Sequence, residues 1–240
     1  MAAEVIVVVG ACGGVGASTL AALLARRRSA DGRRVALVDL DHSHGGAEVL
    51  LGLEDRPGAR WADLQHVRGT LAPADLDDML PRWGPVEVLS GDRRGEPPGA
   101  AATESVWRAL VGGCDSIVVD LPAVAVRAGA VPAHAGASAA LGSRSDLLLV
   151  TGQDVIGVAA ALVIRRAAGP GPLQLVLRRR PAARVSPLEV AHLLDAPLLA
   201  FLPDDRRVAE SVDRGFGPLV PGRSALARAV ARIARGVGHG

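Results

Sequence analysis

A run of buried-strand residues leads directly into a glycine-rich loop near the start of the chain. In VVVGACGGVGAST, residues 7–19, the apolar run stops at the loop and a helical pattern opens near Ser18. Strand, glycine loop and helix in this order form the first half of a βαβ unit, which places the loop at the carboxyl edge of a parallel sheet. The glycines of the loop are Gly10, Gly13, Gly14 and Gly16.

Further short apolar runs alternate with helical patterns along the rest of the chain. Continuous apolar runs of this kind are typical of strands buried on both faces of a parallel sheet. The one linker-like stretch, residues 91–101, is too short and too central to divide domains. We therefore expect residues 1–240 to form one α/β domain, a single doubly wound, mostly parallel sheet flanked by helices. The expected strands are residues 5–9, 35–38, 86–89, 116–119, 147–150, 173–177 and 197–201.

The composition is typical of a globular protein, and because the sequence shows neither a transmembrane run nor a signal peptide, we expect it in the cytoplasm. Of the 240 residues, 49% are hydrophobic and 22% are charged. No apolar run reaches the roughly 20 residues that span a bilayer, and the N-terminus carries Glu4 and no basic segment, unlike a signal peptide. Cys12 and Cys114 lack the spacing of a disulfide framework or a zinc site, so we expect two free thiols.

The loop is suited to binding phosphate. Glycines let a ligand approach the backbone closely, and the helix that follows adds the positive end of its dipole. Neither contribution needs a lysine, and the chain contains none. The spacing of the loop leaves two classes of nucleotide open.

The first class is dinucleotides. Gly10, Gly13 and Gly16 satisfy a GxxGxxG pattern, and Asp39 follows the second strand about twenty residues later, where an acid holds a ribose hydroxyl. This pattern favours a nicotinamide-binding Rossmann protein. The chain has neither the tyrosine nor the lysine that short-chain reductases require, which excludes that subclass. Other dehydrogenases need a placed histidine base, and no histidine here stands in a recognisable motif.

The second class is nucleoside triphosphates, for which a hydroxyl at the start of the helix binds Mg²⁺. Ser18 and Thr19 supply hydroxyls at this position. Asp39 and Asp41 follow the second strand, and Asp120 ends a later strand, from which an acid reaches the Mg²⁺ shell. Loop, hydroxyl and acids in this order favour a triphosphate with Mg²⁺.

These motifs resemble those of the MinD/ParA group of P-loop ATPases. CGGVGAST, residues 12–19, is similar to their deviant Walker A loop KGGVGKTT, and the likeness continues through DLD at 39–41 and VVDLP at 118–122. The resemblance covers nearly the whole chain. It implies a P-loop fold, ATP and Mg²⁺ as ligands, and a homodimer with nucleotide at its interface.

Three longer strings look most like the actinobacterial CpaE/TadZ-like proteins, also called septum-site-determining proteins, which are found beside Tad pilus and secretion genes. The strings are residues 39–64, 80–93 and 213–228. This resemblance implies a positioning or assembly factor for a Tad-like pilus, a secretion system or a division septum, recruited from the cytoplasm to the cell pole or septum. Many CpaE-type relatives carry an N-terminal receiver-like domain, which we expect to be absent because the first strand begins at Val5.

The resemblance also implies roles for individual residues. Asp41 matches the acid that positions the attacking water, and Ser18, Asp39 and the Walker B acid Asp120 are the expected Mg²⁺ residues. Arg178 stands where relatives have an asparagine that contacts adenine, which weakens base selectivity, and a second adenine-side loop lies at residues 202–205. The expected nucleotide-binding residues are Gly13, Gly14, Val15, Gly16, Ala17, Ser18, Thr19, Arg178, Pro203 and Asp204.

Two lysines of the family pattern are replaced. Cys12 stands at the signature lysine that reaches across a dimer, and Ala17 at the Walker lysine that contacts β- and γ-phosphate. Each lost charge-assisted hydrogen bond removes about 1.5–3 kcal/mol, so we expect weak binding of ATP with Mg²⁺. Cationic groups supply about 10³–10⁵ in the rate of phosphoryl transfer, so we expect at most a weak ATPase. Only an arginine can substitute, and the sequence does not place one.

The C-terminal third is basic, although the net charge is only +2. Residues 165–240 hold thirteen arginines against six acids. We expect these arginines to be exposed to solvent, and contact with DNA or with a membrane surface is the alternative. Contact with DNA would favour a partitioning ATPase of the ParA type. Residues 224–237 form an amphipathic helix with a small apolar face, so we expect it to pack on its own domain rather than on a membrane. Its apolar stripe is Leu226, Val230, Ile233 and Val237.

Two histidines follow the second strand. His42 and His44 lie beside Asp41 in a loop that changes conformation in such ATPases. A transition-metal site needs a cluster of further ligands. We therefore expect a polar loop there and no transition metal.

Overall fold

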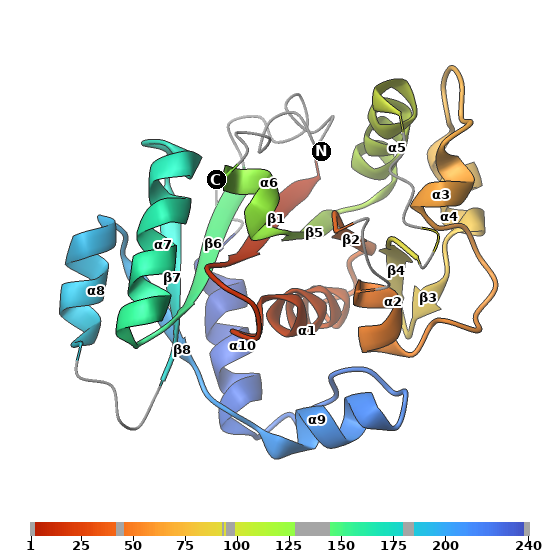
Figure 1. The fold of residues 1–240 in the computed structure, drawn as a ribbon. Coiled ribbons are helices and arrows are strands. Elements are labelled where there is room, and N and C mark those ends of the chain that lie inside the picture. Colours follow the sequence, from red (N-terminus) through yellow and green to blue (C-terminus); the bar gives the residue numbers. More distant parts are fainter. Residues whose placement is uncertain are drawn as a thin grey trace.

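An eight-stranded sheet forms the centre of the molecule (Figure 1). The computed structural model describes residues 3–41, 46–92, 94, 99–127, 145–179 and 185–237. The strands are β1 (Glu4–Gly10), β2 (Val35–Asp39), β3 (Arg82–Trp83), β4 (Val86–Leu89), β5 (Ser116–Leu121), β6 (Ser145–Gly152), β7 (Leu173–Arg178) and β8 (Leu198–Leu202). Their order is β3-β4-β2-β5-β1-β6-β7-β8, and only the β3–β4 pair is antiparallel.

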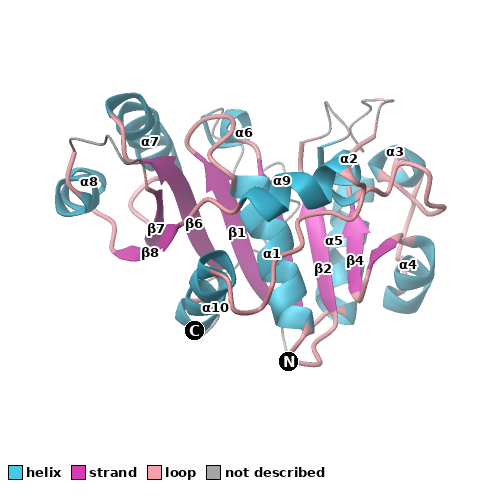
Figure 2. Ribbon diagram, turned by 90° about the horizontal axis from the view of Figure 1, so that it is seen from below, coloured by secondary structure: helices cyan, strands magenta, loops and turns pink. Residues whose placement is uncertain are grey.

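Helices cover both faces of the sheet (Figure 2). The helices of the described residues are α1 (Ala17–Ser29), α2 (Gly46–Leu51), α3 (Trp61–Leu64), α4 (Pro73–Met79), α5 (Ala100–Gly113), α6 (Ala123–Arg127), α7 (Val155–Ala168), α8 (Pro187–Leu194), α9 (Arg206–Asp213) and α10 (Ala225–Gly236). One apolar core joins α1 and α10 to the sheet, and a second joins α5, α7 and α8 to its other face. The expected doubly wound, mostly parallel sheet is confirmed.

The strands form where the apolar runs predict them, and one short strand was not predicted. Arg82 and Trp83 form β3, which turns back at Gly84 and pairs with β4. A strand of two residues is too short for any pattern of alternation to reveal it. It extends the sheet at the edge farthest from β8.

The strand order brings the predicted acids to the end of β1. This strand lies between β5 and β6, and β5 in turn lies beside β2. The register pairs Asp120 with Val8 on one side and with Asp39 on the other. The carboxyl ends of three neighbouring strands therefore meet just below the glycine loop, at the switch point where such folds bind ligands.

A capping box closes the N-terminus of α8. Ser186 Oγ accepts the N–H of Glu189 at 3.1 Å, and the Glu189 carboxylate accepts the N–H of Ser186 at 2.7 Å. In the last turn of α1, the buried Arg28 forms an ion pair with Glu4 and donates to the carbonyl oxygen of Val237 at 2.9 Å. This arginine joins β1, α1 and the end of α10.

The last helix packs on its own domain, as its apolar stripe predicts. Ile233 is fully buried, and the other three residues of the stripe are at most 4% exposed. They belong to the core that α1 shares with the sheet. Among the described residues, no helix combines the length and the apolar content that crossing a bilayer requires.

Candidate functional site

A cavity of about 440 Å³ opens at the carboxyl edge of the sheet, over the glycine loop. It is formed where the loop after β1 meets the ends of β5 and β7 and the residues that follow β2 and β5. Its lining residues are Gly10, Cys12, Gly13, Gly14, Val15, Gly16, Ala17, Ser18, Thr19, Asp41, Asp120, Leu121, Pro122, Ala123 and Arg178. Most of the residues predicted to bind nucleotide therefore lie around one space.

The loop presents backbone to this cavity. Gly14 and Gly16 have φ angles of 74° and 90°, a left-handed conformation that residues with a Cβ rarely adopt. Gly16 is the N-cap of α1, and its carbonyl oxygen accepts the N–H of Leu20 at 2.9 Å. A Cβ added at Gly13 or Gly14 would meet no atom within 4 Å, so this part of the loop is open to a ligand.

Ser18 and Asp120 contact each other beside the loop. The Ser18 side chain forms a hydrogen bond with the Asp120 carboxylate, which lowers the pKa of that carboxyl. Burial has the larger, opposite effect and, together with the charge of Asp41, raises the pKa of Asp120 to about 6. Hydroxyl and carboxylate from α1 and β5 thus meet in the arrangement in which P-loop proteins hold Mg²⁺.

Asp39 lies behind the cavity rather than on its lining. It is 1% exposed, and its two carboxylate oxygens accept the N–H groups of Asp41 at 2.8 Å and Ala47 at 2.9 Å. Burial, followed by the neighbouring charge of Asp120, raises the pKa of Asp39 to about 7. Its backbone carbonyl also accepts the indole N–H of Trp61 at 2.8 Å. Asp39 therefore fixes the start of α2 and the position of Asp41.

Arg178 lies against the loop instead of extending away from it. From the end of β7, its guanidinium donates to the carbonyl oxygen of Gly14 at 3.4 Å and forms an ion pair with Asp204. Pro203 and Asp204 do not line the cavity, and Asp204 is connected to it through Arg178. The structure thus brings Arg178 together with the loop residues, and leaves the other two predicted adenine-side residues at the margin.

The cysteines, the histidines and Ala17 are the remaining residues that the sequence singled out. Cys12 and Ala17, at the two replaced lysines, both line the cavity, and neither has a basic side chain. The predicted thiols are free, Cys12 exposed and Cys114 buried. His42 and His44 lie outside the described residues. Within the described ranges, no group of three or more histidine, cysteine or acidic residues is placed to hold a metal ion.

Some contributors to the site could not be identified from the sequence. Ala47 and Trp61 hold Asp39 from α2 and α3, and neither residue stands in a motif. Residues 121–123 complete the cavity because they follow Asp120 directly. The sequence could have predicted residues 121–123, because they follow the motif at the end of β5. It could not have predicted Ala47 and Trp61, because their contacts depend on how α2 and α3 pack.

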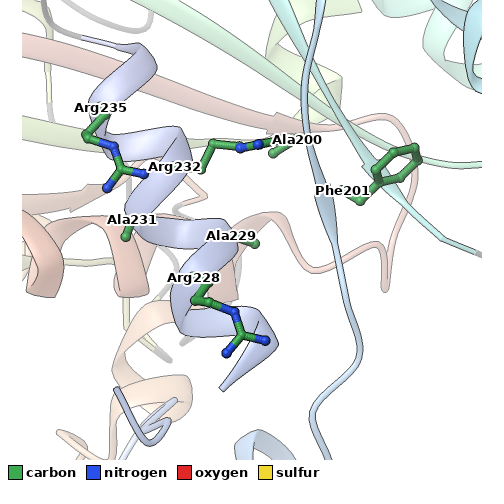
Figure 3. A pocket seen from close by; sticks show the side chains of 7 residues that line it. All are labelled: Ala200, Phe201, Arg228, Ala229, Ala231, Arg232 and Arg235. Carbon is green, nitrogen blue, oxygen red and sulfur yellow. The ribbon is translucent and has the colours of Figure 1, made fainter. Parts of the chain in front are cut away.

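A second cavity, of about 470 Å³, lies between β8 and α10 and shares no lining residue with the first. Figure 3 shows the side chains of Arg228, Arg232 and Arg235 extending from α10, with Ala200 and Phe201 on the neighbouring strand β8. Its lining residues are Ala200, Phe201, Arg228, Ala229, Ala231, Arg232 and Arg235. Three of the thirteen arginines of residues 165–240 thus stand together on the exposed face of α10.

Comparison with known proteins gives one family. Residues 6–219 match the family described as the CobQ/CobB/MinD/ParA nucleotide binding domain. An uncharacterized protein of Mycobacterium tuberculosis is 36% identical over 232 residues, which cover 95% of this chain and 62% of that protein. The septum site-determining protein MinD of Synechocystis is 28% identical over 227 residues, covering 90% of this chain and 82% of that protein.

Solved structures show the same fold. A ParA family ATPase from Chlorobium tepidum superposes with a TM-score of 0.76 at 18% identity, covering 98% of both chains. MinD from Pyrococcus horikoshii, complexed with Mg-ADP, gives a TM-score of 0.69 at 24% identity, over 98% of this chain and 95% of that one. The MinC:MinD complex of Aquifex aeolicus gives 0.72 at 21% identity, over 97% and 94%.

Proposed function

Because the chain belongs to the CobQ/CobB/MinD/ParA nucleotide-binding family, we propose that its loop binds ATP with Mg²⁺ and that the protein acts through binding rather than turnover. The observation that carries this proposal is the contact between Ser18 and Asp120 beside the glycine loop. A hydroxyl and a carboxylate at this place suit a metal-bound triphosphate, whereas a dinucleotide makes no use of them. The Mg-ADP complex of the related MinD is consistent with this choice of ligand.

The residues of the cavity divide the expected contacts between phosphate and metal. The backbone of residues 13–19 holds the phosphates, and Ser18 and Asp120 hold Mg²⁺, with Asp39 behind them. Asp41 lines the cavity and positions a water molecule in any residual hydrolysis. Since neither Cys12 nor Ala17 has a basic side chain, the affinity for ATP is low and its turnover is slow.

We propose that the protein is a positioning or assembly factor of the CpaE/TadZ type, serving a Tad-like pilus, a secretion system or a division septum. The support is the likeness of residues 39–64, 80–93 and 213–228 to those proteins, together with a site that favours binding over catalysis. In this role it forms a homodimer in the cytoplasm and is recruited to the cell pole or septum by its partners. The chain spans 62% of the length of the mycobacterial relative.

A ParA-type partitioning function is the second candidate, and the arginines of α10 are the observation that favours it. Arg228, Arg232 and Arg235 stand on one exposed face of a helix and line a single cavity. A row of cations of this kind attracts the phosphate backbone of DNA, and such binding weakens steeply with salt. The scaffold role predicts no binding to duplex DNA at physiological salt.

A thermal-shift panel separates these candidates, because a ligand raises Tm only when it binds the folded state preferentially. ATP and ADP with Mg²⁺ are expected to raise Tm, while NAD and duplex DNA leave it unchanged. A shift with NAD alone would favour the Rossmann alternative, and a salt-sensitive shift with DNA would favour partitioning. Sedimentation with and without ATP then tests the scaffold role, which requires an oligomeric state that changes little with nucleotide.

A further inference from the structure

We infer that Arg178 supplies the positive charge that the phosphate-binding loop itself lacks. The inference rests on the proposed nucleotide site and assigns to Arg178 a contact with phosphate instead of adenine. Among the described residues that line the cavity, Arg178 is the only cationic side chain. The same cavity is lined by the acids Asp41 and Asp120, so a polyphosphate entering it needs a cation on the protein side as well as Mg²⁺.

The position of the guanidinium supports this role. One of its terminal nitrogens lies 2.9 Å from the place that a Cβ of Gly16 would occupy, and the same nitrogen is 3.4 Å from the carbonyl oxygen of Gly14. The charge is therefore at the N-terminus of α1, although the residue belongs to a strand more than 150 positions later. This is the end of the helix at which phosphate binds in P-loop proteins.

The present partner of Arg178 can be exchanged for phosphate at little cost. The Asp204 side chain is 68% exposed and the Arg178 side chain is 29% exposed. Ion pairs this accessible to water contribute little net free energy. A guanidinium forms bidentate hydrogen bonds with phosphate, and each of its N–H groups is a donor, which matches phosphate oxygens better than the mixed edge of adenine. We therefore place Asp204 as the counter-ion that holds Arg178 over the loop until phosphate binds.

Calorimetry distinguishes a phosphate contact from an adenine contact when the protein is titrated separately with tripolyphosphate, with ATP and Mg²⁺, and with adenosine. Arg178→Ala is expected to lower the affinities for tripolyphosphate and for ATP by similar factors of about 10 to 100. The affinity for adenosine should not change. Arg178→Lys is expected to restore part of the loss, because a lysine keeps the charge without the bidentate geometry. Arg179→Ala is the matched control, since the neighbouring guanidinium packs 4.8 Å from the Phe201 ring centroid and does not line the cavity.

The outcomes separate this inference from the proposed function. If wild type binds ATP and tripolyphosphate, and Arg178→Ala binds both equally well, the inference is wrong and the nucleotide site stands. If Arg178→Ala weakens ATP and adenosine but not tripolyphosphate, Arg178 contacts the base and the inference is again wrong. If wild type binds no phosphate compound, both are overturned. Asp204→Asn is expected to tighten tripolyphosphate binding, and this gain must disappear when Arg178→Ala is combined with it.

Discussion

Ser18, in the first turn of α1, donates a hydrogen bond to the carboxylate of Asp120 at the end of β5. The two residues are about one hundred positions apart and meet only because β1 and β5 are neighbours in the sheet. This contact joins the glycine loop to the acid cluster. It is the arrangement that the nucleotide proposal depends on most.

Removing either partner of this contact is expected to abolish the effect of Mg²⁺ on ATP binding. Ser18→Ala and Asp120→Asn each remove an oxygen that we assign to the metal shell, so the affinity for ATP measured without Mg²⁺ should change little. Titrations with Mg²⁺ and with EDTA measure this difference. Ser186→Ala is the control: it removes the cap of α8, costing about 1 kcal/mol of stability, and must leave the Mg²⁺ effect intact.

Turnover of ATP is expected to stay at or near the rate measured without protein. Neither Cys12 nor Ala17 can stabilise charge on the γ-phosphate, and this stabilisation supplies about 10³–10⁵ in rate in related reactions. Phosphate release by wild type and by Asp41→Ala should therefore be similar. Rapid release that Asp41→Ala abolishes would contradict a binding role and revive the partitioning function.

Because α10 packs on the domain, substitutions on its buried face should destabilise the protein far more than substitutions on its exposed face. Ile233 is fully buried against α1 and the sheet, so Ile233→Ala is expected to lower the free energy of unfolding by about 2–5 kcal/mol. Arg232→Ala, on the exposed face of the same helix, is expected to change it by less than about 0.5 kcal/mol. Urea unfolding measures both. Equal, small effects would mean that α10 does not pack on this domain in solution.

Glu87 gives the fold a dependence on pH that is separate from the loop. Burial, followed by the nearby Asp77, raises the pKa of Glu87 to about 7 from its ordinary 4.5. Between these values the folded state holds a proton that the unfolded state releases, so stability falls as pH rises from about 4.5 through about 7. Glu87→Gln should reduce the loss of stability between pH 5 and pH 8, measured by urea unfolding, and the remaining loss is assigned to Asp39 and Asp120, whose pKa values burial also raises. Glu104→Gln, at an exposed pair with Arg108, should leave the slope unchanged.

The sequence predicts the sheet well because each buried strand is a continuous apolar run with its own boundaries. The same holds for α10, whose apolar stripe lies within one short segment of the sequence. These features are local, so no knowledge of packing is needed to find them. The two-residue strand β3 has no such pattern and was missed.

The residues of the site could be predicted where they lie in the glycine loop, in the first turn of α1 or at the ends of strands. Ser18, Asp41 and Asp120 meet in the cavity because the carboxyl ends of β1, β2 and β5 are adjacent. The place of Arg178 could not be predicted, because the direction of a long side chain at the end of β7 depends on Asp204 and on the shape of the loop. The inward turn of Asp39 likewise depends on Ala47 and Trp61, which no motif connects to it.

Binding of ATP with Mg²⁺ to wild type and to Gly16→Val, compared by calorimetry, tests the nucleotide site most directly. At Gly16 the φ angle of 90° and the nearby guanidinium leave no room for a side chain where phosphate approaches the backbone. Circular dichroism must show that the variant is folded, and Gly222→Ala, whose added Cβ meets no atom within 4 Å, is the control for a neutral glycine substitution. We predict weak binding of ATP and none of NAD by wild type, and no binding by Gly16→Val. Unchanged ATP affinity in a folded Gly16→Val protein would contradict the assignment of the loop as the nucleotide site.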